Sequence, residues 1–209
     1  MGKMETDFNF GFDDDNLFGD DEFNKIDICG LVKKLKRNER KMFDVNNEVK
    51  QLDGLIASPP ADGEVYKLLS IAGGFSSIAV IKFVAKFEVI EQLYCSTFRI
   101  GRKQFEVIEQ LNDCKRILKA NFITSTTQKN TDTDYAYYEY ICESCKNRGF
   151  GLKIFNNHSK LILMKTKKNY YVVETSSNLN ENPKIEQFSF ENDKELFLWY
   201  EEFFKELMK

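Results

Sequence analysis

One stretch of the chain concentrates residue types that can act on a phosphate ester. His158, the only histidine in the 209 residues, is followed two positions later by Lys160. A polar segment with the sequence TSSNLNEN occupies residues 175–182, and Glu186 lies beyond it. An imidazole can serve as nucleophile or base, an ammonium group can offset developing negative charge, and hydroxyl and amide groups can bind phosphate oxygens. These residue types predict group transfer at a phosphate ester.

The segment between these groups predicts a β-hairpin that brings them together. Apolar residues alternate over 160–165, which favours a strand, and an extended chain would point His158 and Lys160 to the same face. Residues 167–169 are expected to form the turn, and the aromatic and β-branched run 170–173 the return strand. The polar segment would then start where the second strand ends, beside the imidazole and the ammonium group.

The order His158-Ser159-Lys160, then Thr175-Ser176-Ser177-Asn178, resembles the phospholipase D superfamily, whose motif is HxK, usually followed by an Asp and then by GSxN. The Asn-rich run and the acidic residue after it look like the single-motif, nuclease-like branch. The chain departs from the motif at two positions, since Lys165 stands at the usual Asp and Thr175 at the usual Gly. The Asp is regarded as supporting the site rather than performing the chemistry. The hairpin is also a few residues longer than usual.

The resemblance implies a metal-independent phosphodiesterase, most simply a nuclease acting on DNA or RNA without a cofactor. Superfamily chemistry uses one imidazole to attack phosphorus and a second to protonate the leaving oxygen. A chain with a single histidine supplies both only as a homodimer whose two-fold axis brings the two copies of His158 together. By this resemblance the expected catalytic residues are His158, Lys160, Asn178 and Glu186, and the expected substrate-binding residues are Ser176, Ser177, Asn180 and Asn182.

Two alternatives stay open. A lone histidine is commonly an ordinary surface or core residue, and a Ser/Asn cluster is commonly a turn. Lys165 and Thr175 could also mark a catalytically degenerate phospholipase D-like domain that binds nucleic acid or serves in protein assembly. Phosphodiester turnover separates an enzyme from such a module.

The rest of the chain predicts an α/β fold, in which a mixed sheet is flanked by helices. Strand-like and helix-like patterns alternate before the hairpin, which is typical of helices packed on the faces of a sheet. The expected strands are 65–72, 93–98, 116–123 and 149–155, and the expected helices are 76–87, 104–111 and 135–146. The resemblance extends over about this region, so we place a phospholipase D-like domain at 61–209.

The clearest local prediction is a C-terminal helix. Asn192 is expected to cap it, with Glu195 three residues on. A wide aromatic stripe should pack as core against the sheet, with part of it available for a subunit interface. This stripe includes Leu196, Trp199, Phe203 and Leu207.

Two further patterns carry less information about function. The heptapeptide FEVIEQL occurs at 87–93, where a helix is expected to pass into a strand, and again at 105–111, within an expected helix. Cys142 and Cys145 form a CxxC late in an expected helix, without a second such pair, and we interpret them as buried or idle thiols.

The charge distribution separates the N-terminus from the remainder. Residues 1–22 hold eight acidic residues and one lysine, which gives −7, so the remainder carries +4 of the total −3. We expect 1–22 to be a disordered acidic tail that could dock on a protein partner, and 23–60 to be a helical extension and linker. A mildly positive body suits a nucleic acid.

Composition also bears on the compartment. No apolar run approaches the ~20 residues that span a bilayer, and no secretory signal is recognisable, so we expect no membrane association. Five cysteines, an odd number, favour reduced thiols in the cytoplasm.

Overall fold

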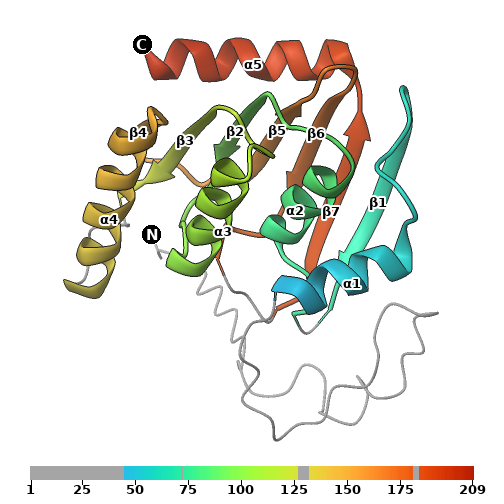
Figure 1. The fold of residues 1–209 in the computed structure, drawn as a ribbon, viewed down its shortest axis with the longest axis horizontal. Helices are drawn as coiled ribbons and strands as arrows, with labels where there is room; N and C mark the ends of the chain where they lie inside the picture. The colour runs from blue at the N-terminus through green and yellow to red at the C-terminus, as the bar shows by residue number, and fades with distance from the viewer. Residues whose placement is uncertain (1–44, 72, 127–131, 181–183) are drawn as a thin grey trace, which may run out of the picture. The chain divides into compact units, whose positions relative to one another are not determined.

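The computed structural model describes residues 45–71, 73–126, 132–180 and 184–209 (Figure 1). The predicted tail, most of the predicted helical extension and Asn182 lie outside these residues. None of the described helices is long and apolar enough to cross a membrane. The helices are α1 (Val45–Leu55), α2 (Ser77–Phe87), α3 (Arg102–Asp113), α4 (Asp132–Arg148) and α5 (Lys194–Met208). The strands are β1 (Val65–Ser70), β2 (Gln92–Ser96), β3 (Ala120–Ser125), β4 (Gly151–Phe155), β5 (Leu161–Lys165), β6 (Tyr170–Thr175) and β7 (Glu186–Asn192).

The strands form a single mixed sheet in the order β1-β7-β6-β5-β2-β3-β4. Helices α3 and α4 connect β2, β3 and β4, and these three strands are parallel because a helical crossover returns the chain to the same end of the sheet. The other neighbours are antiparallel, and β5 and β6 form the expected hairpin. The predicted α/β class, with a mixed sheet flanked by helices, is confirmed.

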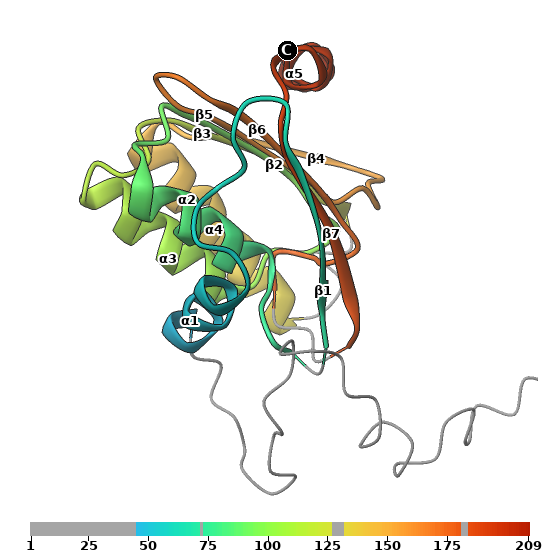
Figure 2. The ribbon, with the colours of Figure 1, turned by 90° about the vertical axis from the view of Figure 1, so that its right-hand side faces the viewer.

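The helices divide unequally between the two faces of the sheet (Figure 2). The larger core lies on the face covered by α1 to α4, where Ile78, Ile81 and Val84 of α2 are fully buried, as their spacing predicts. Helix α5 packs alone on the other face, against β4, β5 and β6. The part of that face formed by β1 and β7 is therefore left without a helix of the described chain over it.

Strand β7 was missed by the sequence analysis. Phe188 and Phe190 point into the larger core, as alternation requires, but Glu186, Ser189 and Asn192 are also buried. Buried polar residues hide the period-2 pattern that identifies a strand in sequence. β7 pairs with both β1 and β6, so it joins the first strand to the hairpin.

The prediction of the C-terminal cap was wrong by one residue. Asp193 is the N-cap of α5, and its carboxylate accepts a hydrogen bond of 2.9 Å from the Leu196 amide. Asn192 is instead the last residue of β7, where its carbonyl oxygen Oδ1 accepts the Tyr170 amide at 3.0 Å and its amide donates to Asn169 Oδ1 at 2.9 Å. It therefore fastens the β5–β6 turn.

The aromatic stripe of α5 packs as core in part, and the rest of it is exposed. Phe197 and Phe204 are fully buried, whereas Trp199 is 66% and Phe203 46% exposed. Amphipathicity defines an apolar stripe, but the place where the helix crosses the sheet decides how much of the stripe is covered. Helix α5 contacts β4, β5 and β6.

The CxxC lies late in α4, as expected, and both thiols are free. Cys145 is buried, and burial raises the pKa of its thiol to about 12. A thiol that stays protonated is a poor nucleophile and metal ligand. The interpretation as idle thiols is consistent with this environment.

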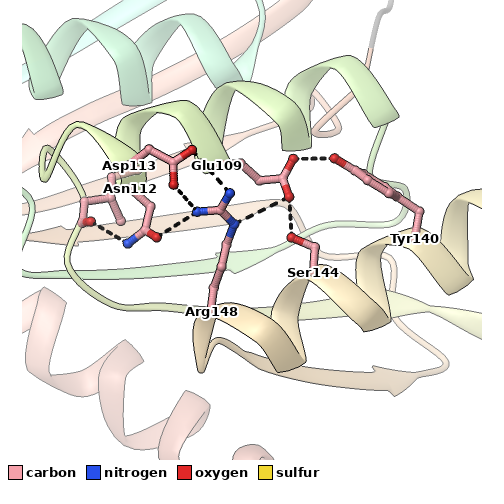
Figure 3. Close-up of polar contacts among 7 residues, drawn as sticks. Glu109, Asn112, Asp113, Tyr140, Ser144 and Arg148 are labelled. Atoms are coloured by element: carbon pink, nitrogen blue, oxygen red, sulfur yellow. Dashed lines mark hydrogen bonds and ion pairs between the residues drawn. The ribbon is translucent and has the colours of Figure 1, made fainter.

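A polar network holds α3 against α4 (Figure 3). Glu109 of α3 accepts hydrogen bonds from the Tyr140 and Ser144 hydroxyls and lies 3.5 Å from Arg148 Nε. Arg148 also contacts Asp113 at 2.5 Å. Glu109 and Arg148 are both largely buried, and Arg148 is the charge partner of Glu109, whereas Arg148 is shared between Glu109 and Asp113.

Replacing Glu109 by Ala should therefore destabilise the fold. The change leaves the Tyr140 and Ser144 hydroxyls without their acceptor and removes one of the two carboxylates that contact Arg148, and we expect a loss of about 2–3 kcal/mol in the free energy of unfolding. The control is Glu106→Ala, which removes an exposed pair with Arg102 and should cost under about 0.5 kcal/mol. Urea unfolding of both variants tests this, and equal losses would contradict it.

Glu88, which follows α2, ties that helix to the hairpin. Its carboxylate accepts hydrogen bonds from Tyr171 Oη at 2.6 Å, Thr166 Oγ1 at 2.7 Å and Asn169 Nδ2 at 2.8 Å. Burial alone would raise the pKa of Glu88, but these three bonds outweigh it and hold the pKa below the ordinary value of 4.5. The ionised carboxylate is the form that the fold prefers.

The contribution of Glu88 should consequently depend on pH. Because its folded-state pKa is depressed, the carboxylate stabilises the fold above pH 4.5, and this contribution is lost as pH falls through the lower folded-state value. In urea unfolding at a series of pH values, Glu88→Gln should be less stable than the wild type at neutral pH, and the difference should shrink at acid pH. A difference that stays constant or widens toward acid pH would contradict this role.

Candidate active site

The candidate site lies at one edge of the sheet, where several strand ends meet. Ser96, the last residue of β2, pairs with Leu161, the first of β5, and Leu161 pairs with Glu174 near the end of β6. Ser70 at the end of β1 pairs with Glu186 at the start of β7. Segments far apart in sequence therefore come together here, namely 97–101, 157–160 and 176–180.

His158 and Lys160 lie in the loop before β5. The strand starts at Leu161, later than expected, so the two side chains are not held by the alternation of a strand. Instead, Lys160 folds back onto the histidine, with Nζ 3.0 Å from His158 Nδ1 and 2.6 Å from the His158 carbonyl oxygen. His158 is exposed, and Lys160 is half-buried.

Neighbouring residues that the motif does not include fix this loop. Asn157 donates from Nδ2 to Ser96 Oγ at 3.0 Å and to the Thr97 carbonyl at 3.1 Å. The Phe98 ring lies 5.0 Å from the His158 ring between centroids, and the Lys160 ammonium lies 5.9 Å from the Phe98 centroid. The sequence analysis gave neither Asn157 nor Phe98 a role in the site, although the adjacency of Asn157 to His158 was a usable signal.

Ser176 and Glu186 form a second pair at the same edge. The Ser176 hydroxyl donates to the Glu186 carboxylate, and the Gln187 amide donates to Ser176 Oγ at 3.1 Å. Glu186 is buried and close enough to Lys160 to act on its charge. Burial lowers the pKa of Lys160, and the Glu186 charge opposes that decrease. His158, Lys160, Ser176 and Glu186 thus belong to one connected group.

The other expected site residues are placed differently. Ser177 is buried, and it donates to the Asn178 carbonyl at 3.2 Å while its own carbonyl accepts from Ser77 at 3.0 Å. Asn180 lies beside Gly101 at the start of α3. The side-chain oxygens of Asn178 and Asn180 are buried, and neither has a hydrogen-bond partner among the described residues. Ser177 therefore anchors the segment to α2, away from solvent.

Of the two departures from the superfamily motif, Thr175 lies at the candidate site and Lys165 does not. Thr175 takes part in the edge, because its hydroxyl donates to the Gln187 carbonyl at 2.8 Å and accepts the Ser177 amide at 2.9 Å. Lys165 lies at the far end of β5, over the Tyr170 ring. Threonine thus holds the turn with bonds that glycine lacks, whereas Lys165 is remote from His158.

An open groove of about 780 Å³ leads away from Lys160. It runs over β1 and β7, on the part of the sheet face that no described helix covers, to the exposed rings of α5. Its lining is Lys67, Leu68, Leu69, Ser159, Lys160, Leu161, Glu174, Thr175, Gln187, Phe188, Ser189, Trp199, Tyr200 and Phe203. We refer to this feature as the α5 groove.

The site contains cationic and neutral hydrogen-bond donors. The Lys160 contact also selects one tautomer of the His158 ring. A protonated Lys160 can only donate, so Nδ1 of His158 accepts and Nε2 carries the ring proton. Within the described part of the chain, no group of three or more His, Cys, Asp or Glu side chains is placed to hold a metal ion. The edge can bind an anion through Lys160.

Comparison with known proteins gives likenesses to solved structures. No protein-family model and no curated protein matches the chain. Phosphatidylserine synthase of Haemophilus influenzae Rd KW20 is similar with a TM-score of 0.49 and 15% identity, over 68% of this chain and 38% of that one. TrmBL2, an archaeal chromatin protein whose structure shows a novel mode of DNA binding, is similar with a TM-score of 0.45 and 13% identity, over 75% of this chain and 57% of that one. The chain spans less than two thirds of the length of either protein.

Proposed function

We propose that the protein is a phospholipase D-like, metal-independent phosphodiesterase, and specifically a nuclease that uses His158 as its nucleophile. The observation that carries this proposal is the contact of 3.0 Å between the Lys160 ammonium and His158 Nδ1, at an open edge of the sheet beside Ser176 and Glu186. Because Lys160 can reach both His158 and an incoming phosphate, the nucleophile and the positive charge that stabilises the phosphate lie at one point.

The reaction takes place in two displacements. In the first, the lone pair of His158 Nε2 attacks phosphorus, an N–P bond forms, and the P–O bond to the leaving group breaks. A second, protonated imidazole gives its proton to the leaving oxygen. In the second, that imidazole takes a proton from water, the oxygen of water attacks phosphorus, and the N–P bond breaks. Both histidines return to their starting states.

Attack through Nε2 requires that this atom carries a lone pair. While Lys160 donates to Nδ1, the ring proton lies on Nε2 and attack is blocked. A substrate phosphate offers the ammonium a stronger, charged acceptor, which would draw Lys160 from the ring and free Nδ1 to take the proton. Asn178 would then add a neutral donor to the phosphate oxygens, Ser176 would do so once its hydroxyl turns away from Glu186, and Glu186 balances the positive charge of Lys160.

One chain contains one histidine, so the second imidazole must come from another copy. The proposal therefore includes a homodimer in which His158 of each subunit faces the same phosphate. The exposure of His158 on the loop before β5 supports this, because an exposed imidazole is accessible to its counterpart.

The second candidate function is a nucleic-acid-binding module without catalysis. The observation that favours it is the same contact between Lys160 and Nδ1, since an imidazole held in that tautomer has no lone pair on Nε2. Lys165 at the usual Asp position points the same way. Such a module would bind with a salt-dependent affinity and never cleave.

Cleavage in EDTA tests the enzyme. The wild type should cut fluorescent DNA or RNA, offered as single and double strands, and His158→Ala should cut at least about a thousandfold more slowly because the nucleophile is gone. The control is Asn156→Ala, an exposed neighbour outside the site, which should cut like the wild type. Circular dichroism checks that all three are folded. Activity retained in His158→Ala would refute the assignment, and binding without cleavage would favour the module.

Mixing experiments test the shared site. An excess of His158→Ala subunits should inhibit the wild type after the chains are allowed to exchange, because most wild-type chains then sit in mixed dimers with a single imidazole. The measurement is residual cleavage against the ratio of the two proteins, together with the mass from light scattering. A monomeric mass, with cleavage that the variant does not reduce, would contradict the homodimer.

A further inference from the structure

Two large aromatic side chains of α5 lie open to solvent. Trp199 is 66% and Phe203 46% exposed, and both line the α5 groove. They are four residues apart, so they lie on the same side of the helix. Their neighbour Tyr200 is held in place, because its hydroxyl donates to Glu174 on the floor of the groove. We refer to Trp199, Tyr200 and Phe203 as the aromatic wall of the groove.

The floor of the groove is one row of residues across four strands. Lys67 pairs with Ser189, Ser189 with Glu174, and Glu174 with Leu161. Residues that pair directly point to the same face of a sheet, here the face of α5. Lys160 precedes Leu161 at one end of the row, and Lys67 lies at the other. Three strand spacings, roughly 14 Å, separate the two ends.

Three of the four residues in this row are polar, with Lys67 at one end and Lys160 next to Leu161 at the other. Lys67 Nζ donates to Ser189 Oγ at 2.6 Å, which places an ammonium group on the open part of the sheet. Lys160 belongs both to this floor and to the candidate active site. A ligand bound at Lys160 and extending along the groove would pass the aromatic wall and then meet Lys67.

We propose that the α5 groove binds single-stranded nucleic acid, with an unstacked base against Trp199 and the backbone phosphates at Lys160 and Lys67. Aromatic faces beside a cationic track are the features by which single strands are bound without reading sequence. This inference rests on the proposed function, because it extends the same substrate away from His158.

The charges of the groove favour a single strand over a duplex. Glu174 lies between the two lysines on the floor, so a continuous row of phosphates would be repelled there. A single strand can place a neutral base over that position. In a duplex the bases are stacked on one another, and exposing one to Trp199 costs a few kcal/mol per step.

The groove suits a lipid chain or a second copy less well. An acyl chain on this floor would bury Lys67, Glu174 and Gln187 without any polar partner of its own. A second copy would bury Lys67 and Glu174 of both chains, although these side chains are already bonded to Ser189 and Tyr200 of their own chain. Both occupants are kept as outcomes of the test.

Trp199 is the only tryptophan of the chain, so its fluorescence reports on the groove alone. Titration of full-length His158→Ala with a single-stranded DNA or RNA of about 12 nucleotides should quench this fluorescence, because a base stacks on the indole. The same sequence as a duplex should quench it far less. Use of the inactive variant separates the two proposals. Quenching, if the wild type does not cleave, would support binding in the α5 groove and refute the nuclease activity.

The affinity of variants for a fluorescently labelled single strand, measured by anisotropy, tests the same contact. Trp199→Ala should weaken binding about tenfold or more, and Lys67→Ala should weaken it and reduce the salt dependence by about one ion. The control is Leu198→Ala, an exposed side chain of α5 outside the groove, which should bind like the wild type.

Several outcomes would overturn the inference. One is equal affinity of Trp199→Ala and Leu198→Ala for the single strand. Others are equal quenching by duplex and single strand, and quenching by vesicles containing phosphatidylglycerol but not by nucleic acid. A change from dimer to monomer in Trp199→Ala, without loss of affinity per chain, would assign the aromatic wall to contact between copies.

Discussion

The antiparallel pairing of β5 with β2 is the constraint on which the candidate site depends. It sets the first residue of β5, Leu161, against the last residue of β2, Ser96, so a strand start and a strand end share one edge. The loop that carries His158 and Lys160 is thereby joined to the segment after β2 by Asn157. A slip of one residue would turn Leu161 and Leu163 out of their core and move Lys160 from its place. Burial of the hairpin thus fixes the register, and the register fixes the polar groups.

The sequence around a segment predicted its structure where the residues of the segment itself did not. The two copies of FEVIEQL show this, since the expected contexts of both are confirmed. At 105–111 the heptapeptide lies within α3, which begins after Gly101. At 87–93 the same residues leave α2 and enter β2, because Glu88 is bound by the hairpin and Leu93 pairs with Ala120. Flanking residues distinguish the copies in sequence, and contacts across the sheet enforce the difference.

Long-range packing decided the features that sequence did not predict. The polar residues of β7 are buried because Glu186 is bonded to Ser176 just after β6 and Asn192 to Tyr170 at the start of β6, and no pattern within 186–192 shows this. Likewise, the stripe of α5 predicts an amphipathic helix, yet the exposure of Trp199 follows from where the helix crosses the sheet. For the site, the motif predicted that His158 and Lys160 act together, but their contact arises from a loop conformation rather than from a strand.

Lys160 is the point at which the proposed chemistry and the proposed groove become one system. Its side chain is half-buried, and burial lowers its pKa. An anionic partner therefore stabilises the charged form of Lys160 more than it would that of an exposed lysine. Without a phosphate, it donates to His158 Nδ1 and holds the imidazole in the unreactive tautomer. A phosphate positioned along the groove would compete for the same ammonium and release the ring. Under this mechanism, binding of the strand itself prepares the nucleophile, because one hydrogen-bond donor cannot serve the histidine and the substrate equally well.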